Sequence, residues 1–400
     1  MDLHSGMPYW LVRDGLRTDY PVLASDLRTD VVIVGGGITG SLCAYTFTVA
    51  GMDVVVLDGR SIGTGSTCAS TSLLQYEIDT PLHRLIGMVG EKNAVRSYEL
   101  CVKAIARLGA IAREIGFGEF TPRPSIQYAS VRAHERMLAT EFAARKAHGL
   151  PGELLDGVAE VRTALPFDAQ AALRTTVAAE TNAYGYTHAL HAKSIADGAR
   201  IFQLTEVSEF RDSASGVEVR TVDGHTVHAQ YLVYATGYES RDLLPKKVIR
   251  LHSTYAVISE PNTGAEPWKD NALIWETAKP YLYMRTAPEG RIIIGGRDEP
   301  FRDPALRDAL LVKKTKTLCS DFHDLMPAVP FRQEYAWCGT FGETKDGLPY
   351  IDRGPRANRS YYALGMGGNG ITFSIIAAEI IRDRMMGRPN HDGPIFRFDR

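Results

Sequence analysis

Three glycines after a short apolar segment carry the clearest chemical signal in this sequence. Gly35, Gly37 and Gly40 follow four branched residues at 31–34, and Asp58 ends a second apolar segment 23 residues after Gly35. Such segments are typical of strands buried in a parallel sheet. In a G-x-G-x-x-G turn the glycines allow a sharp bend, a close approach of backbone to pyrophosphate and tight packing of the next helix. The helix N-terminus then faces phosphates and the acid binds ribose hydroxyls, so we expect a dinucleotide-binding site.

Several remote segments are predicted to position this turn and the rest of the site. Residues 31–58 form a β-α-β unit with its helix at 41–50, a strand at 231–234 ends in small residues at 235–237, and a strand at 361–364 leads into a glycine-rich turn at 365–370. Further helices are expected at 91–115, 132–148, 187–199, 304–326 and 371–385, and further strands at 125–130, 199–207, 216–222 and 227–234. Residues 1–30 are expected to be an irregular leader.

Between residues 251 and 296 the pattern changes to short alternating strands, at 253–259, 272–276, 281–285 and 291–295. Turns that contain proline and glycine separate them, which favours an antiparallel sheet in a separate lobe. We therefore expect an α/β (α+β) fold, with a Rossmann-like nucleotide domain and a discontinuous substrate domain. The expected ranges are 1–90, 155–245 and 330–400 for the nucleotide domain, and 91–154 and 246–329 for the substrate domain.

Composition narrows the class of protein. The 400 residues include 44% hydrophobic and 23% charged residues, and the formal net charge is −2, so neither nucleic acid nor an anionic membrane is an expected partner. No apolar run approaches the roughly 20 residues that span a bilayer. The first 30 residues lack a signal-peptide pattern, and the five cysteines form no C-x-x-C, which indicates a reducing cytoplasm. No His or Cys pair has metal-ligand spacing, so no metal is expected.

FAD fits the sequence better than NAD, because FAD is longer and needs several remote segments along its length. The hydroxyl-rich loop 65–71 is suited to the pyrophosphate, and the turn at 365–370 opens a helix whose positive end can face the flavin. The residues predicted to bind the cofactor are Gly35, Gly37, Ile38, Thr39, Gly40, Asp58, Gly59, Arg60, Gly65, Ser66, Thr67, Ser70, Thr71, Val207, Ala235, Thr236, Gly237, Gly339, Gly367, Gly368, Asn369, Gly370, Ile371 and Thr372.

The chain resembles the D-amino-acid oxidase/glycine oxidase/sarcosine oxidase superfamily of FAD-dependent oxidoreductases (DAO family). The motifs that carry the resemblance are VVIVGGGITG at 31–40, GSTCAS at 65–70, YATG at 234–237, WCGTFGETKDGLPYI at 337–351 and GMGGNGI at 365–371. The resemblance implies oxidation of the C–N bond of an amine or amino acid, with hydride transfer to flavin N5 and hydrolysis of the imine. It also implies a small-molecule substrate and either oxygen or another electron acceptor.

Three departures from the family pattern bear on the substrate and on the flavin link. Amino-acid-oxidising relatives clamp the substrate carboxylate with an arginine in a segment that reads Gly-Thr-Phe-Gly at 339–342 here, and glycine oxidase-like members have another where Gly368 stands. A simple small α-amino acid is therefore not the expected substrate. Sarcosine oxidase-like members bind FAD through a cysteine. Here Gly339 takes that place and Cys338 is one residue off, on the opposite side of a strand, so we expect non-covalent FAD.

Five residues are predicted to contact the substrate or the flavin. Tyr283 and Arg285 alternate on one strand, where Arg285 is either an anionic anchor or a solvent-facing side chain; Tyr255 is either a substrate contact or a packing residue. Glu343 is suited to pair with an amine, and Lys345 to assist oxygen reduction. Arg297, after two glycines, is a further candidate that either points toward the cofactor or faces solvent.

Three other functions remain open at this point. One is an FAD-dependent dehydrogenase of a hydroxy acid or a glycerol-phosphate-like substrate, which requires a basic cluster. Another is a non-catalytic FAD-binding subunit. The third, a plain NAD dehydrogenase, is the least favoured.

Overall fold

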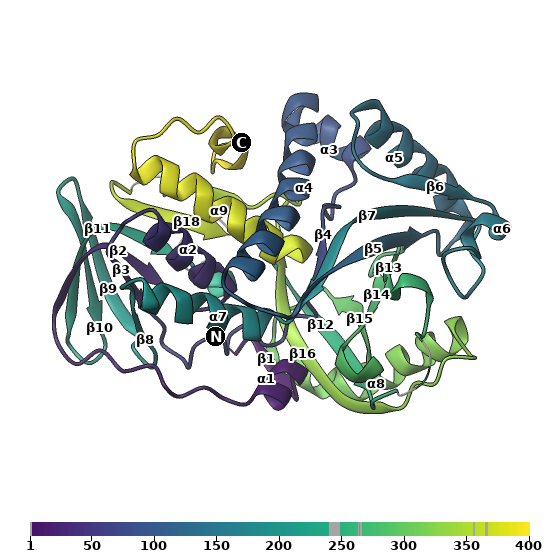
Figure 1. Cartoon of the computed structure of the whole chain (residues 1–400), viewed down its shortest axis with the longest axis horizontal. Helices are drawn as coiled ribbons and strands as arrows, with labels where there is room; N and C mark the ends of the chain where they lie inside the picture. The colour runs from purple at the N-terminus through teal and green to yellow at the C-terminus, as the bar shows by residue number, and fades with distance from the viewer. Residues whose placement is uncertain (1, 240–248, 263, 265, 355–356, 365–366) are drawn as a thin grey trace.

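The computed structural model of the chain describes all residues except 1, 240–248, 263, 265, 355–356 and 365–366. Its strands form two sheets that lie beside each other along the longest axis of the molecule (Figure 1). The eight-stranded sheet occupies the left half of this view and the ten-stranded sheet the right half. Helix α4 (Glu91–Glu114) stands over the boundary and contacts elements of both halves.

The smaller sheet has the order β17-β18-β11-β2-β3-β8, and its strands from β18 to β8 are parallel. Helices α2, α7 and α9 cover one face, where they pack on Ile33 and Val56. The β9–β10 hairpin contributes to the core on the other face, around Val32 and Val55. The bounds are β2 Leu27–Val34, β3 Val54–Leu57, β8 Arg200–Phe202, β9 Val207–Ser213, β10 Gly216–Thr221, β11 Thr226–Tyr234, β17 Tyr350–Arg353, β18 Ser360–Leu364, α2 Ile38–Val49, α7 Ala183–Ala196 and α9 Gly370–Met385.

The larger sheet has the order β1-β16-β12-β15-β14-β13-β5-β7-β4, and β6 pairs with β7. Its pairs are antiparallel except β13 with β5. Helix α8 packs on one face, against Ile292 and Ile294 of β15, whereas Ile293 faces the opposite side together with Trp337. The bounds are β1 His4–Gly6, β4 Leu73–Gln75, β5 Phe120–Tyr128, β6 Glu153–Asp156, β7 Ala171–Thr181, β12 Arg250–Ser259, β13 Leu273–Glu276, β14 Leu282–Thr286, β15 Ile292–Glu299, β16 Gln333–Glu343 and α8 Pro304–Leu325.

The predicted architecture is confirmed in its main parts. The β-α-β unit is β2-α2-β3, the four alternating strands are β12 to β15, and the long helices are α4, α5 (Glu135–Ala147), α7, α8 and α9. Two predictions are wrong. The leader contains β1, which pairs with β16, and α1 (Tyr9–Asp14), which buries Trp10. The strand expected at 199–207 is split, because Leu204 takes a left-handed φ of 49° between β8 and β9.

Strand membership also differs from the expected domain ranges. Strands β1, β4, β7 and β16 all fall in ranges assigned to the nucleotide domain, yet they belong to the ten-stranded sheet. β7 had no clear signal, because small alanines occupy its buried positions. The chain therefore passes between the two sheets more often than the expected domain ranges imply. Each passage places a segment at the boundary of the sheets.

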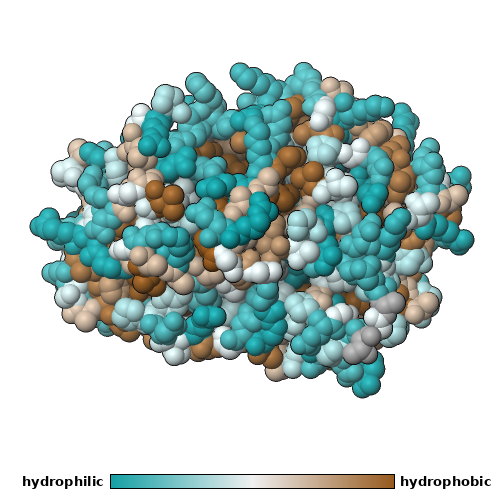
Figure 2. All heavy atoms as spheres, viewed as in Figure 1, coloured by the Kyte–Doolittle hydropathy of each residue, from teal (hydrophilic) through white to brown (hydrophobic). Residues whose placement is uncertain are grey.

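The helices of the described chain include none that is long and apolar enough to cross a membrane. The remaining short helices are α3 (Leu82–Val89) and α6 (Val158–Val161). On the face seen in Figure 2, hydrophilic residues dominate and hydrophobic ones lie scattered among them.

Candidate active site

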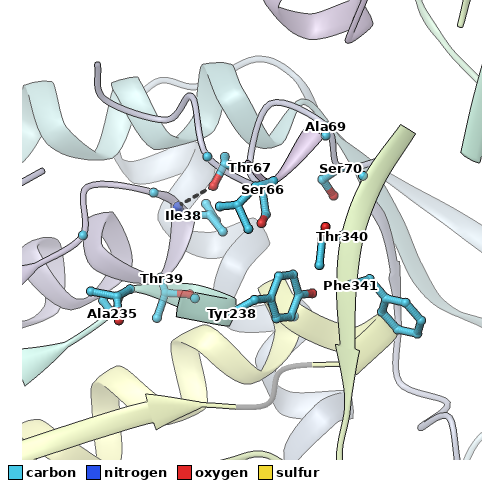
Figure 3. Close-up of a pocket in the computed structure, with 18 of the residues that line it drawn as sticks. Ile38, Thr39, Ser66, Thr67, Ala69, Ser70, Ala235, Tyr238, Thr340 and Phe341 are labelled. Carbon is cyan, nitrogen blue, oxygen red and sulfur yellow. Dashed lines mark hydrogen bonds between the residues drawn. The ribbon is translucent and has the colours of Figure 1, made fainter. Parts of the chain in front are cut away.

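A cavity of about 720 Å³ lies at the boundary of the two sheets and is lined by segments of both (Figure 3). This volume is in the range of pockets that hold small molecules and cofactors. One end is formed by the turn after β2, the end of β3 and the turn after β11; the other by the ten-stranded sheet, including Thr254, Tyr283 and Gly339. The cavity is therefore lined at one end by the predicted nucleotide-binding segments and at the other by the ten-stranded sheet, which we call the roof.

The glycine turn has the geometry that its spacing predicts. Gly35 has a left-handed φ of 108°, and a Cβ there would lie 2.5 Å from the carbonyl oxygen of Ala235. A Cβ on Gly40 would lie 1.8 Å from the carbonyl oxygen of Gly35, so only glycine lets α2 pack on the turn. The backbone N–H of Ile38, in the first turn of α2, donates to Thr67 Oγ1 at 3.0 Å (Figure 3). The hydroxyl-rich loop is therefore fixed beside the helix N-terminus.

Asp58 lies at the end of β3, as predicted, and is held by backbone. Its two carboxylate oxygens accept hydrogen bonds from the N–H groups of Gly36, at 2.7 Å, and Arg60, at 2.8 Å. Burial raises the pKa of Asp58, and these backbone donors oppose that shift. The Arg60 guanidinium pairs with Glu239 at 2.7 Å. A carboxylate fixed in this way beside the glycine turn is suited to bind ribose hydroxyls.

The lining fits an FAD molecule. All residues predicted to bind the cofactor line the cavity except Gly40, which packs behind the turn, and Thr372, which is buried in α9. Ser66 Oγ is buried and has no hydrogen-bond partner among the described residues. The N-terminus of α9 opens onto the same cavity through Gly370 and Ile371. An unsatisfied hydroxyl and two helix N-termini are the donors that a pyrophosphate and a flavin require.

A β-bulge shapes the opposite end of the cavity. Tyr255 of β12 pairs with Gly296 of β15, but Ser253 pairs with Glu299, so β15 has one extra residue. Gly296 and Arg297 both take left-handed φ values, of 123° and 55°. The bulge changes which side chains face the cavity: Asp298 lines it, whereas Arg297 points away and pairs with Asp321 at 2.7 Å. Of the two orientations that the sequence leaves open for Arg297, the one toward the cofactor is therefore wrong.

Comparison with known proteins identifies the family. The family model described as FAD dependent oxidoreductase (DAO) matches residues 30–384. The chain belongs to this family. It is 24% identical over 375 residues to glycine oxidase of Bacillus licheniformis, covering 90% of this chain and 94% of that protein. It is 25% identical over 387 residues to gamma-glutamylputrescine oxidoreductase of Escherichia coli (strain K12), covering 92% and 86%.

Solved structures agree with this assignment. L-proline dehydrogenase from P. horikoshii superposes with a TM-score of 0.77 at 20% sequence identity, covering 94% of this chain and 98% of that one. The predicted fold class is therefore confirmed, and this DAO-family chain is an FAD-dependent oxidoreductase.

Two predicted substrate residues of this DAO-family enzyme lie away from the cavity. Arg285 is buried with 1% of its surface exposed, donates to the carbonyl oxygens of Ser72 and Thr181, and lies over the Trp10 ring. Burial lowers the pKa of Arg285 to about 10. Tyr255 faces α8, where its hydroxyl donates to the carbonyl oxygen of Arg307 at 3.4 Å. Both residues lie on the predicted strands, but α1 covers Arg285 and α8 covers Tyr255.

Of the three other residues predicted to contact the substrate or the flavin, one lines the cavity and two do not. Tyr283 lines the cavity, and burial raises its pKa to about 12. Glu343 lies outside the lining and faces His252, with Oε2 3.4 Å from Nε2, and this contact lowers the pKa of Glu343. Lys345 is exposed and does not line the cavity. The Cys338 thiol faces Ser5 and Asp308, at 3.2 and 3.4 Å, so the adjacent Gly339 alone turns toward the cavity, as expected.

Sequence reasoning missed the carboxylates of this site. Glu77, Asp79 and Asp298 line the cavity, and so do Trp275 and Tyr281. Burial raises the pKa of Asp79 and raises that of Asp298 to about 6. Glu77 and Asp79 both follow β4, which has no clear strand pattern, and the position of Asp298 depends on the bulge. The Gly-Gly pair at 295–296 was the only sequence signal for that bulge.

Proposed function

We propose that this enzyme oxidises the C–N bond of an amine or amino acid, and that its substrate is not a simple small α-amino acid. The observation that supports this proposal most strongly is the charge of the cavity. Among the described lining residues the sole lysine or arginine is Arg60, beside Asp58 at the nucleotide end, whereas Glu77, Asp79 and Asp298 lie at the other end. A carboxylate substrate needs a cation there, because an unpaired buried charge is strongly unfavourable.

The positions of the predicted arginine clamps support the same conclusion. A Cβ on Gly368 would lie 2.7 Å from Asp79 Oδ1, so a side chain starting there would meet a carboxylate. In the other segment the place of the clamp arginine is taken by Phe341, which lines the cavity with an uncharged ring. The relative named gamma-glutamylputrescine oxidoreductase shows that the family includes enzymes named for amine-type substrates.

The residues of the cavity would have distinct tasks in such a reaction. FAD, when bound, accepts the electrons and hydrogen that leave the substrate carbon. The glycine turn, Asp58 and Ser66 would hold its nucleotide end, and the N-terminus of α9 would stabilise negative charge on the reduced ring. The rings of Tyr281 and Tyr283 would orient the substrate and exclude water. The substrate reacts as the neutral amine, so the proton of a bound ammonium would first pass to a carboxylate of the site or to water.

We further propose that FAD is bound non-covalently and that the enzyme works in the cytoplasm. No cysteine or histidine of the described chain lines the cavity, and the Cys338 thiol turns toward Asp308. All five cysteines are free thiols, which is typical of a reducing compartment. Oxygen or another acceptor would reoxidise the flavin. Acid precipitation tests the flavin link: the yellow cofactor should remain in the supernatant, and a coloured pellet would contradict it.

The reaction is tested by anaerobic reduction of the bound flavin. The holoenzyme is mixed with amines, N-methyl amino acids, D-amino acids and hydroxy acids, and peroxide is measured after air is admitted. We expect bleaching by an amine-type compound and none by hydroxy acids. Bleaching by a hydroxy acid alone would identify a C–O dehydrogenase instead, and a flavin that no compound bleaches would indicate a non-catalytic subunit. Peroxide formation distinguishes an oxidase from a dehydrogenase.

A further inference from the structure

The end of the cavity formed by the ten-stranded sheet contains a buried carboxylate, Asp298, that makes no ion pair with a lysine or arginine among the described residues. Asp298 reaches the lining because of the bulge in β15, and its Oδ1 is buried with no hydrogen-bond partner among the described residues. Gly295, which precedes the bulge, accommodates the Tyr283 ring: a Cβ there would lie 2.5 Å from Tyr283 Oη. The strained segment thus places an aromatic ring and a carboxylate on the same wall. Strain at such a position is typical of a functional site.

A second carboxylate with an unpaired oxygen lines the cavity from the segment that follows β4. Glu77 is 6% exposed, lines the cavity, and has one oxygen, Oε2, without a partner in the described structure; the other lies 3.5 Å from Arg145. Asp79, two residues on, accepts a hydrogen bond from the N–H of Gly368 at 2.9 Å. Both carboxylates therefore retain capacity to accept hydrogen bonds from a ligand.

Among the described residues, His252 is the group that partly offsets these negative charges: its contact with Glu343 raises the pKa of His252, and Asp298 adds to that shift. The pKa of Asp298 is raised by burial, and Glu343 and Asp79 add to that shift, whereas His252 and the Thr254 side chain oppose it. Burial raises the pKa of Tyr281 well above its usual value, and Asp79 and Asp298 raise it further. His252 faces Glu343, and Lys279, which lowers the pKa of Asp79, is exposed. A ligand that brings a positive charge would relieve all of these interactions.

We propose that this end of the cavity recognises its ligand as an alkylammonium group, bound between Asp298, Asp79 and the rings of Tyr281 and Tyr283. The substrate class is an amine with no carboxylate next to its nitrogen. Carboxylates supply charge-assisted hydrogen bonds to N–H donors, and aromatic faces attract ammonium groups. This inference rests on the proposed function, since it assigns the chemical class of substrate to the same site.

Ligands that cannot be oxidised test the inference separately from turnover. Tert-butylammonium, tert-butanol and pivalate share a tert-butyl group, differ in charge, and have no hydrogen on the carbon next to the functional group. Each is titrated into oxidised holoenzyme, and its Kd is read from the change in the visible spectrum of bound flavin. We expect tert-butylammonium to bind at least about tenfold more tightly than pivalate. Tighter binding of pivalate, or no spectral change with tert-butylammonium, would overturn the inference.

Two isosteric variants locate the effect. Asp298→Asn should weaken tert-butylammonium binding about tenfold or more while changing tert-butanol binding little. Glu299→Gln is the matched control: it removes the same charge from the next residue, which pairs with Lys314 at 2.6 Å and does not line the cavity. Equal effects of both variants would refute a local role for Asp298. If Asp298→Asn does not retain FAD, Asp79→Asn takes its place in the comparison. The ligand series on the wild-type enzyme tests the inference independently of both variants.

Failure of the inference and failure of the proposed function give different results. If the holoenzyme prefers tert-butylammonium but no amine reduces its flavin, the recognition site is supported and C–N oxidation is refuted. If the holoenzyme prefers pivalate but an amino acid reduces its flavin, C–N oxidation is supported and the assigned substrate class is refuted.

Discussion

Replacement of Gly40 by alanine isolates the packing on which the nucleotide site depends. Gly40 lies in the first turns of α2, where alanine ordinarily stabilises a helix by about 1 kcal/mol relative to glycine. Here the new Cβ would lie 1.8 Å from the carbonyl oxygen of Gly35, well inside the distance at which real Cβ atoms are found. That oxygen belongs to backbone and cannot rotate away, so α2 or the turn must move. Overpacking costs about 1–3 kcal/mol, and a clash this close with rigid backbone belongs in the upper part of that range, about 2–3 kcal/mol, which exceeds the gain in helix propensity.

The matched control is Gly87→Ala. Gly87 lies in α3, and a Cβ there would meet nothing within 4 Å, so the change should leave stability unchanged or raise it by up to about 1 kcal/mol. We expect Gly40→Ala to lower the free energy of unfolding of the apoprotein by about 1–2 kcal/mol in urea titrations. We also expect it to weaken FAD retention, because the turn carries the phosphate-facing N–H groups. A Gly40→Ala protein with wild-type stability and one FAD per chain would refute this reasoning.

Three further predictions concern the roof and the core. The affinity for tert-butylammonium should fall as pH drops below about 6, because protonation of Asp298 removes its charge. A pH series of Kd values for Asp298→Asn should show a smaller dependence, which comes from Asp79, whose pKa burial also raises. Gly295→Ala should displace the Tyr283 ring and weaken ammonium binding about threefold to tenfold with FAD content unchanged; unchanged Kd values would contradict the placement of that ring. Glu141→Gln should lower the free energy of unfolding by about 3 kcal/mol in urea titrations. The change leaves the buried Arg145 guanidinium with an uncharged partner in place of the carboxylate that now lies 2.7 Å away. A loss below about 1 kcal/mol would show that other groups satisfy Arg145.

The nucleotide end could be predicted from sequence because its signals are local. Glycine spacing, a buried apolar segment and an acid at a strand end all act within one β-α-β unit, and the structure places Gly35 and Asp58 where the spacing predicts. The predicted loop and turn segments also line the cavity. Backbone constraints at such positions exclude nearly all alternatives, which is why a short motif carries so much information.

The roof end could not be predicted in the same way, because it depends on long-range pairing. Alternation alone places Arg297 on the cavity face, but one extra residue in β15 reverses the pattern and brings Asp298 there instead. The placement of Arg285 depends on Trp10 of α1, a helix that sequence reasoning took for an irregular leader. Register and distant segments thus decide which of several plausible side chains reaches the site.

The most direct test of the account is the rate of anaerobic flavin reduction by an amine and by the amino acid that differs from it only in an α-carboxylate. Because carboxylates line the cavity, they should repel the α-carboxylate of the amino acid. We therefore expect the amine to reduce the flavin at least about tenfold faster at equal subsaturating concentration. Faster reduction by the amino acid would contradict both the substrate class and the electrostatic argument for it.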